Sequence, residues 1–370
     1  MIRVQRVENK EDLKTFVRLP FALYSGDPHW VPPLLKEEYQ MFHPDRNPFY
    51  AHAEVALFLA YRDQTPCGRI AAVINHRHNE FHREKAAFFG FYEAEYEEEA
   101  SFALFTAVCD FAREKGMELL RGPMNFSTNE TCGMLVDGFE RDPVVMMPYN
   151  PAYYPRRVES FGMKKAMDLY SYLYDAENPH TKRILRLADA VSSRHSYSLR
   201  PITKKNVFRI LEDFKKVYDR SWERNWGFVP MTPAEMDHLA AQLKDVLEPG
   251  LAFILLDGEV PIGASVSLPD INQVLKTLKG RVTLRGLFRA KKAFREIDTV
   301  RTLILGVAPE FRKRGLELML IAETIRQGTK KGYRFADLGW ILENNDLMNR
   351  ELGNMGAKIY KRYRIYEMGL

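Results

Sequence analysis

An internal duplication constrains this chain more than any other feature of its sequence. Two segments, ALFLAYRDQTPCGRIAAVIN and LAFILLDGEVPIGASVSLPDIN, match each other, and each reads as two strands joined by a polar turn. Pro66 and Gly68 of the first segment correspond to Pro261 and Gly263 of the second, and both pairs are 195 residues apart. A repeat at about half the chain length indicates two copies of one supersecondary plan.

The same correspondence extends to both ends of each copy. The spacing from Asn150 to Gly162 equals that from Asn344 to Gly356, and a tyrosine-rich strand pattern follows each glycine. Each copy reads as strand, one or two helices, hairpin, long strand, helix, strand, helix, strand, an alternation that predicts layered α/β domains. We expect one domain over 1–174, a turn and connecting helix over 175–198, and a second domain over 199–370.

The composition limits what kind of protein this chain can be. The 370 residues suffice for two ordinary domains, and 46% apolar with 28% charged residues is typical of a soluble globular chain. The sequence contains no run of eighteen apolar residues and no signal-peptide pattern at its start. The cysteines Cys67, Cys109 and Cys132 lack metal-ligand spacing, so we expect a reducing cytoplasm. A net charge of +5 allows an anionic ligand without indicating nucleic acid.

The second copy contains a segment, TLILGVAPEFRKRGLELMLIAETIRQ, that begins at Thr302. Leu303, Leu305 and Val307 alternate as in a half-buried strand. Pro309 ends the strand pattern because it has no N–H to donate.

A cationic turn follows this strand. Arg312, Lys313, Arg314 and Gly315 precede a helical pattern that begins at Leu316. The N–H groups of a first helical turn and the helix dipole favour anions, and glycine allows close approach of a phosphate. The turn therefore predicts an anion-binding site.

VAPEFRKRG resembles motif A of the GNAT acyltransferases, whose R-x-x-G-x-G/A turn binds the pyrophosphate of coenzyme A. The chain departs from that motif at Glu317, where the family has Gly or Ala. An asparagine before the last helix contacts CoA in the family, although an asparagine there is equally typical of a helix N-cap. The resemblance implies a CoA-binding set made of the strand, the turn, the helix start and this asparagine: Leu305, Val307, Arg312, Lys313, Arg314, Gly315, Leu316, Glu317 and Asn344 or Asn345.

The first copy carries acids at the matching position. The segment FFGFYEAEYEEEAS places Glu93, Glu95, Glu97, Glu98 and Glu99 where the second copy has cations and glycine. Carboxylates at a helix start favour the helix and repel a phosphate. Only the second copy is therefore expected to bind CoA.

The whole chain resembles the tandem-GNAT class, in an uncharacterised bacterial branch with signatures such as WERNWGFVP and GWILENNDLMNRELGNMGAKIYKRYRIYE. The resemblance implies two tandem GNAT-like α/β domains with mixed sheets flanked by helices. Related classes include N-myristoyltransferases, peptidoglycan transferases that use aminoacyl-tRNA, and some bacterial sphingolipid N-acyltransferases. The implied activity is transfer of an acetyl or longer acyl group from acyl-CoA to a small-molecule or lipid-like amine. An aminoacyl-tRNA-dependent transferase and a non-catalytic ligand-binding protein are the alternatives.

Acyl transfer needs a route for the amine proton and for the thiolate. Many family members protonate the thiolate with a tyrosine at the position that Leu352 occupies here, so either Tyr360 takes this role or the thiolate leaves unaided. Glu296 and Asp298 precede the motif strand and are candidates for the general base. The pattern favours the other interpretation of both residues, as solvated charges at the start of a strand.

Two segments are candidates for binding the acceptor. One is the aromatic segment after the second copy's first helices, and the other is a polar insertion between Asn125 and Asn150 that reads either as a binding lid or as a structural loop. The candidate substrate residues are Trp222, Asn225, Trp226, Asn125, Asn129 and Glu130.

Two further patterns have more than one interpretation. His76, His78 and His82 have a metal-like spacing but no accompanying ligands, so a solvated loop and no metal are expected. A second insertion, over 273–295, carries eight cations among leucines and phenylalanines. It predicts peripheral contact with an anionic membrane, contact with RNA (a tRNA under the alternative function), or a cover over the active-site cleft.

Overall fold

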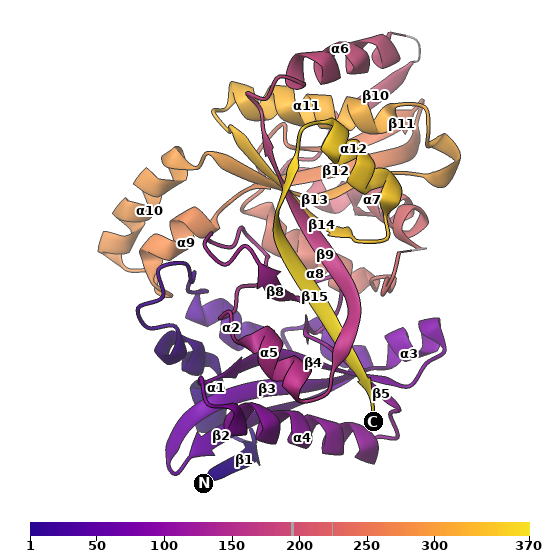
Figure 1. Ribbon diagram of the computed structural model, residues 1–370. Helices are drawn as coiled ribbons and strands as arrows, with labels where there is room; N and C mark the ends of the chain where they lie inside the picture. The colour runs from indigo at the N-terminus through magenta and orange to yellow at the C-terminus, as the bar shows by residue number, and fades with distance from the viewer. Residues whose placement is uncertain (194–195, 224) are drawn as a thin grey trace. The chain divides into compact units, whose positions relative to one another are not determined.

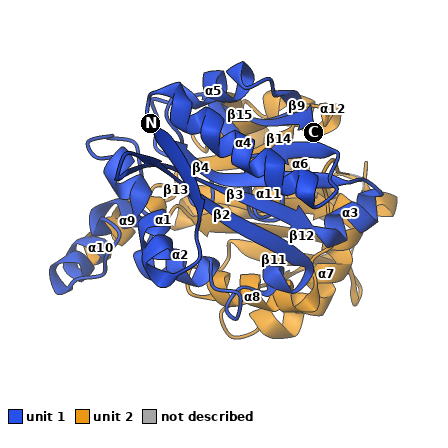
Figure 2. Cartoon of the chain, turned by 90° about the horizontal axis from the view of Figure 1, so that it is seen from below, with its two compact units in different colours: residues 1–169, 275–290, 361–370 blue, residues 170–274, 291–360 orange. Residues whose placement is uncertain are grey.

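The structure, a computed structural model, describes residues 1–193, 196–223 and 225–370 (Figure 1). The chain forms two compact units, shown in different colours in Figure 2. Unit 1 consists of residues 1–169, 275–290 and 361–370, and unit 2 of residues 170–274 and 291–360. Neither unit is one continuous stretch of sequence.

Unit 1 is built around a sheet with the strand order β1-β2-β3-β4-β5-β15. The β4–β5 pair is parallel, and the other neighbouring pairs are antiparallel. Its elements are β1 (Ile2–Arg6), α1 (Lys10–Leu23), α2 (Leu35–Met41), the 3-10 helix η1 (Pro48–His52), β2 (Ala53–Arg62), β3 (Thr65–Asn75), α3 (His76–His82), β4 (Ala86–Ala94), α4 (Glu98–Glu114), β5 (Leu119–Gly122), β6 (Met124–Asn125), β7 (Thr131–Cys132), β8 (Met134–Asp137), α5 (Tyr154–Ser160) and the first half of β9 (Lys164–Asp175). Helix α4 buries Leu104, Phe105 and Val108 against this sheet.

Unit 2 repeats the plan with the strand order β9-β14-β13-β12-β11-β10. Its elements are α6 (Thr181–Ser192), β10 (Tyr197–Pro201), α7 (Val207–Trp222), α8 (Pro233–Lys244), β11 (Ala252–Asp257), β12 (Val260–Pro269), β13 (Thr299–Val307), the 3-10 helix η2 (Pro309–Phe311), α11 (Leu316–Lys330), β14 (Phe335–Leu342), α12 (Asp346–Asn354) and the start of β15 (Lys358–Gly369). Helices α9 (Asn272–Leu278) and α10 (Leu284–Glu296) lie between β12 and β13 in sequence, and each crosses a unit boundary.

The predicted duplication and the α/β fold class are confirmed. Each copy has a strand, one or two helices, a hairpin and then a strand–helix–strand segment, in the same order. Both hairpins even shift register at matching positions, between Ala60 and Tyr61 and between Leu255 and Leu256.

The compact units differ from the linear division into 1–174, 175–198 and 199–370 that the sequence suggested. The last strand of the second copy, β15, pairs with β5 in unit 1, and the last strand of the first copy, β9, is the neighbour of β14 in unit 2. The segment 275–290 also belongs to unit 1. An open sheet edge can pair with any suitable strand. The two closing strands are both tyrosine-rich and similar in pattern, so the sequence alone does not show which sheet each of them joins.

In unit 1 the acids at the end of β4 are used inside the fold. Glu95 pairs with Arg62, with Arg62 Nη2 at 2.6 Å from Glu95 Oε1. Glu98 and Glu99 lie in the first turn of α4, where carboxylates suit the helix dipole. The position that binds anions in motif A is therefore occupied by acids with structural partners.

Glu93 is the most deeply placed of these acids, with a side chain that is 13% exposed. Its Oε2 accepts hydrogen bonds from the hydroxyls of Tyr24 (2.7 Å) and Tyr154 (2.9 Å). Burial raises the pKa of Glu93 to about 7, although the nearby Arg69 guanidinium opposes the shift. The carboxyl is therefore protonated in a large fraction of molecules at neutral pH.

This shift predicts a pH-dependent stability. A carboxyl whose pKa is higher in the folded than in the unfolded chain stabilises the fold fully below its unfolded pKa, near 4.3, and this contribution is lost as pH rises to 7. A glutamine cannot titrate, so the Glu93→Gln variant should not lose this contribution. We expect the free energy of unfolding of the variant minus that of the wild type to rise by on the order of 3 kcal/mol from pH 5 to pH 8. Urea unfolding across this range measures the difference.

The same substitution at exposed Glu114 on α4 is the control, and it should leave the pH dependence of the wild type in place. If Glu93→Gln and wild type had parallel curves of stability against pH, Glu93 would not titrate in this range.

Candidate functional site

The candidate site begins where two parallel strands of unit 2 separate. β13 and β14 pair only at Thr299 with Phe335, Val300 with Ala336, and Arg301 with Asp337. Beyond these positions β13 continues to Val307 and β14 to Leu342 without further pairing. The two strands therefore separate after Arg301 and Asp337, and a gap lies between their C-terminal halves.

A buried carboxylate marks the point of separation. Asp337 is fully buried, and its Oδ2 accepts hydrogen bonds from Ser171 Oγ and Tyr360 OH, both at 2.6 Å. Arg301 Nε lies 3.8 Å from Asp337 Oδ1. Gly339 must be glycine here, because a Cβ would overlap Ser171 Oγ. Partners from β9, β13 and β15 thus hold β14 at the start of the gap.

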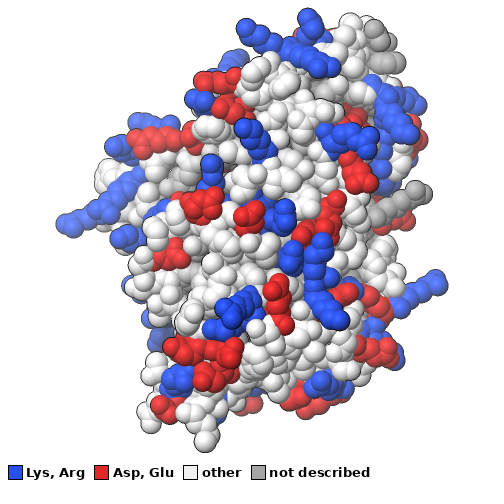
Figure 3. Space-filling view, viewed as in Figure 1, with Lys and Arg blue, Asp and Glu red and all other residues white. Residues whose placement is uncertain are grey.

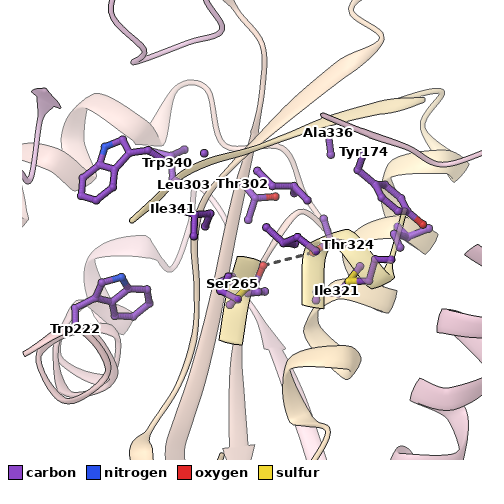
Figure 4. Close-up of a pocket in the computed structure, with 17 residues that line it drawn as sticks. Tyr174, Trp222, Ser265, Thr302, Leu303, Ile321, Thr324, Ala336, Trp340 and Ile341 are labelled. Carbon is purple, nitrogen blue, oxygen red and sulfur yellow. Dashed lines mark hydrogen bonds between the residues drawn. The ribbon is translucent and has the colours of Figure 1, made fainter. Parts of the chain in front are cut away.

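The gap contains a cavity of about 110 Å³. Figure 4 shows the rings of Trp222 and Trp340 at one end and Tyr174 at the other. Its lining is mostly apolar and comes from strands and helices of unit 2: Tyr174, Trp222, Ser265, Thr302, Leu303, Leu305, Ile321, Thr324, Ile325, Ala336, Leu338, Gly339, Trp340, Ile341, Met348, Leu352 and Met355. A cavity of this composition suits an extended, largely apolar ligand.

The polar side-chain groups of the lining are hydroxyls and the indole N–H groups of Trp222 and Trp340. Ser265 Oγ and Thr324 Oγ1 lie 3.5 Å apart, and Thr302 Oγ1 lies 2.9 Å from Ser267 Oγ. The Tyr174 hydroxyl bonds with a threonine hydroxyl of α6 at 2.7 Å. Among the described residues of the lining, none carries a carboxylate, an imidazole or an ammonium group. The cavity therefore offers neutral hydrogen-bonding groups and no charge.

A β-bulge lies at the same cavity. Val266 of β12 is opposite Ile304 of β13, but the next residue, Ser267, is opposite Thr302. Leu303 is the extra residue, and a bulged residue is left out of the hydrogen-bond ladder. Leu303 also lines the cavity, so the bulge lies at the cavity wall.

The cationic turn predicted from the sequence lies between η2 and α11. Arg312, Lys313 and Arg314 are exposed, and no side chain caps the first turn of α11. The Arg312 guanidinium donates to the carbonyl oxygens of Val307 (3.1 Å) and Ser221 (2.9 Å), so this arginine is partly structural. Three cations thus lie beside an uncapped helix start, an arrangement that gives the turn positive potential.

Gly315 has two structural requirements at this turn. Its φ of 77° is in the left-handed region, and a Cβ would lie 2.9 Å from Val191 Cγ2 of α6. Helix α6, inside the predicted connecting segment, packs along α11. Glu317 is half-buried in the first turn of α11. The pKa of Glu351 is raised first by the burial of Glu351 itself and then by the negative charge of Glu317. The departure from motif A therefore adds negative potential near the turn.

Of the other predicted CoA-contacting residues, Leu305 lines the cavity, whereas Val307 and Leu316 are buried in an adjoining apolar cluster. Asn345 is the N-cap of α12, and its side chain accepts a hydrogen bond from the Met348 N–H at 3.2 Å. Asn344 is exposed, and neither asparagine lines the cavity. CoA contact by either one stays a prediction.

The three predicted catalytic residues do not gather at the cavity. Glu296 is exposed, with Lys292 Nζ at 3.8 Å. Asp298 precedes β13 and accepts a hydrogen bond from the Gln273 side chain at 3.2 Å. The Tyr360 hydroxyl donates to Asp337, as described above. None of the three is among the residues that line the cavity.

The predicted acceptor residues fall in different units. Trp222, Asn225 and Trp226 belong to unit 2, where Trp222 lines the cavity and the other two are half-buried. Asn125, Asn129 and Glu130 belong to unit 1 and are also half-buried. Each of the two sets therefore lies within a single unit.

In unit 1 the insertion fills the gap that corresponds to the cavity. β4 and β5 also pair at only three positions. The Asn125 side chain accepts a hydrogen bond from the Phe91 N–H of β4 at 2.8 Å. The buried ring of Phe126 follows, with the Phe91 and Phe49 rings at 5.0 and 5.1 Å. Of the two interpretations of this insertion, the described contacts are those of a structural loop.

Sequence reasoning missed Asp337 and Trp340. Both lie in FADLGWIL, where Asp337 is the one charged residue of an otherwise apolar strand. A buried charge requires partners, so this aspartate was a readable signal. Its partners Ser171 and Arg301 are too distant in sequence to have been assigned.

The histidine pattern has a structural role in unit 1. His78 is buried with its Nε2 at 2.6 Å from Glu84 Oε1, and burial lowers the pKa of His78 to about 4. The His76 ring lies 3.2 Å from a Glu54 oxygen. Across the described parts of the chain, no cluster of three or more His, Cys, Asp or Glu residues has metal-binding geometry. In the same parts, no helix has the length and apolar character needed to cross a bilayer.

Comparisons with known proteins identify relatives of the chain. No family model matches the chain. The chain is 34% identical to the bacterial ceramide synthase of Caulobacter vibrioides, over 98% of this chain and 96% of that protein. It is 30% identical to protein YghO of Escherichia coli, over 97% and 93% of the two chains.

Solved structures show the fold. A tandem GNAT protein from the clavulanic acid biosynthesis pathway has a TM-score of 0.61 at 11% identity, over 100% of this chain and 98% of that chain. A probable N-acyltransferase from Enterococcus faecalis has a TM-score of 0.53 at 10% identity, over 99% and 72%. The chain therefore belongs to the family of the Caulobacter ceramide synthase and YghO, and it has the tandem-GNAT acyltransferase fold.

Proposed function

We propose that this protein transfers a long acyl chain from acyl-CoA to the primary amine of a long-chain amino alcohol, which gives a ceramide-type amide. The observation that carries the proposal is the apolar cavity between β13 and β14, in the unit that also holds the cationic turn. The ceramide synthase with which this chain shares 34% identity supports this choice of substrates.

The residues present fit an acyl-CoA donor. Exposed Arg312, Lys313 and Arg314 supply positive charge for phosphates, and the uncapped start of α11 adds N–H donors. The thioester arm of CoA is neutral and extended, which suits an apolar lining with hydroxyls such as Ser265 and Thr324. In unit 1 the corresponding gap is filled, so unit 2 is the donor-binding half in this proposal.

The reaction needs little acid–base chemistry from the lining. The amine nitrogen attacks the thioester carbonyl, the C–N bond forms, and the C–S bond breaks as the ammonium proton passes to solvent or a base. The peptide groups at the Leu303 bulge are the proposed stabilisers of the oxyanion. A thiol has a pKa of about 8.5, so the thiolate leaves unaided in this scheme. Tyr360 then acts as a positioning residue, because its hydroxyl donates to Asp337.

Thiol release by the purified chain tests the proposal. Palmitoyl-CoA with sphinganine should release free thiol and form a product with the mass of the amide. Acetyl-CoA or a short amine should give rates at least about tenfold lower, because they leave apolar area of the site unused. No thiol release with any CoA thioester would contradict the proposal, and amide formation from aminoacyl-tRNA instead would favour the alternative transferase.

Lys313 tests the phosphate contact without disturbing the fold, because its side chain is exposed and the structure describes no ion pair for it. We expect Lys313→Gln to raise the KM for palmitoyl-CoA about tenfold with kcat nearly unchanged. Lys330→Gln, at the exposed other end of α11, is the matched control and should leave the KM near wild type. Palmitoyl-pantetheine lacks the nucleotide, so its kcat/KM should be equal for wild type and Lys313→Gln. A similar loss with both donors would rule out the phosphate role.

Two threonines of α11 form a matched pair for testing the cavity. Thr324 lines the cavity and Thr329 is exposed, and each hydroxyl donates to the carbonyl four residues earlier. We expect Thr324→Phe to fill the cavity and lower kcat/KM for palmitoyl-CoA at least about tenfold, whereas Thr329→Phe should change it less than about twofold. Circular dichroism and thermal unfolding check that both variants fold. Equal activities of the two folded variants would place the donor outside this cavity.

A further inference from the structure

Helix α10 and the turn before it expose large apolar side chains to solvent. Leu284 is 80% exposed, Leu287 51% and Phe288 79%. Their spacing of three and four residues places them on one side of the helix. Val282 and Phe294 are also exposed, at 57% and 46%. Such a contiguous apolar surface indicates an interaction site.

The other side of α10 consists of small residues. Gly286 is buried, and Ala290 and Ala293 are half-buried. At Gly286 this side lies against Leu278 of α9, and the apolar stripe of Leu284, Leu287 and Phe288 faces outward.

The segment before α10 is fixed to unit 1. The Leu35 N–H of α2 donates to the Gly280 carbonyl at 3.2 Å. The Lys276 ammonium pairs with Asp142, whose other oxygen lies 2.9 Å from His29 Nδ1. Figure 2 shows α9 and α10 at the margin of unit 1, beside α1 and α2. The exposed stripe is thus presented by an anchored element.

Cations surround the apolar stripe. Space-filling atoms of Lys and Arg edge this part of the surface in Figure 3. Over the same segment the exposed cations are Arg281, Arg285, Arg289, Lys291, Lys292 and Arg295. Of these six side chains, Lys292 alone forms an ion pair within the described part of the chain, with Glu296 at 3.8 Å. The remaining positive charge is available to an external anion.

We propose that α10 docks this protein on an anionic lipid bilayer. In the docked state Leu284, Leu287 and Phe288 insert among the acyl chains, and the flanking cations contact lipid phosphates. RNA would satisfy the same cations but would leave the leucines in water, so the combination of apolar stripe and charge favours lipid. The proposal rests on exposure and charge, and it holds whichever amine the enzyme acylates.

Co-sedimentation of the full chain with vesicles, without donor or acceptor, tests this docking. We expect binding to phosphatidylcholine vesicles with about one third phosphatidylglycerol, and at least about tenfold weaker partitioning to phosphatidylcholine alone or at high salt. Salt-sensitive binding to tRNA without binding to any vesicle would overturn the proposal, as would no binding at all.

Paired variants separate the contribution of the apolar stripe to vesicle binding from that of the cations. Leu284→Ser with Phe288→Ser should lower partitioning at least about tenfold while leaving the Tm unchanged, because both side chains are exposed. Val260→Ser with Leu347→Ser removes two other exposed apolar side chains and should bind vesicles like wild type.

Arg285→Gln with Arg289→Gln should reduce the dependence on anionic lipid. Equal partitioning of wild type and the Leu284→Ser, Phe288→Ser variant would show that α10 does not insert.

Discussion

The buried carboxylate of Asp337 is the constraint on which the candidate site depends. Taking a charge out of water costs several kcal/mol unless partners compensate it, and here Ser171, Tyr360 and Arg301 surround the carboxylate. These partners come from three other strands of unit 2. The end of the β13–β14 pairing, the bulge and the cavity all lie directly beyond this point. One polar network therefore lies at the point where the two strands separate.

The two copies show how one plan gives two outcomes. In each copy a pair of parallel strands separates after three paired positions. The first copy fills the gap with its own insertion around Asn125 and Phe126, and it places the protonatable Glu93 near the end of β4. The second copy leaves the gap as a cavity and follows β13 with a cationic turn. The two copies thus share one frame, and an insertion in the first and a cationic turn in the second distinguish their gaps.

Local patterns in the sequence predicted what depends on local physics. The hairpins, the strand that ends at Pro309, the Gly315 turn and the acids of the first copy were all readable, because each depends on neighbours a few residues away. The exchange of closing strands and the Ser171–Asp337 contact join residues more than a hundred positions apart. The filling of the first gap joins Phe91 of one strand to the insertion at Asn125, a tertiary contact that no local pattern encodes. For Asn345 the sequence leaves two roles open, because an asparagine suits both a helix N-cap and a ligand contact.

Lipid chemistry links the cavity to α10 under the proposed function. An amide that carries two long chains has an unfavourable free energy in water of about 0.8 kcal/mol per exposed CH₂, so its release into solvent would be very slow. A bilayer removes this barrier because it accepts the chains directly. In sequence, α9 and α10 join β12 to β13, the two strands that form the bulge beside the cavity. If α10 docks on lipid as proposed, an insertion at this connection supplies the lipid-binding element without interrupting either the cavity or the cationic turn.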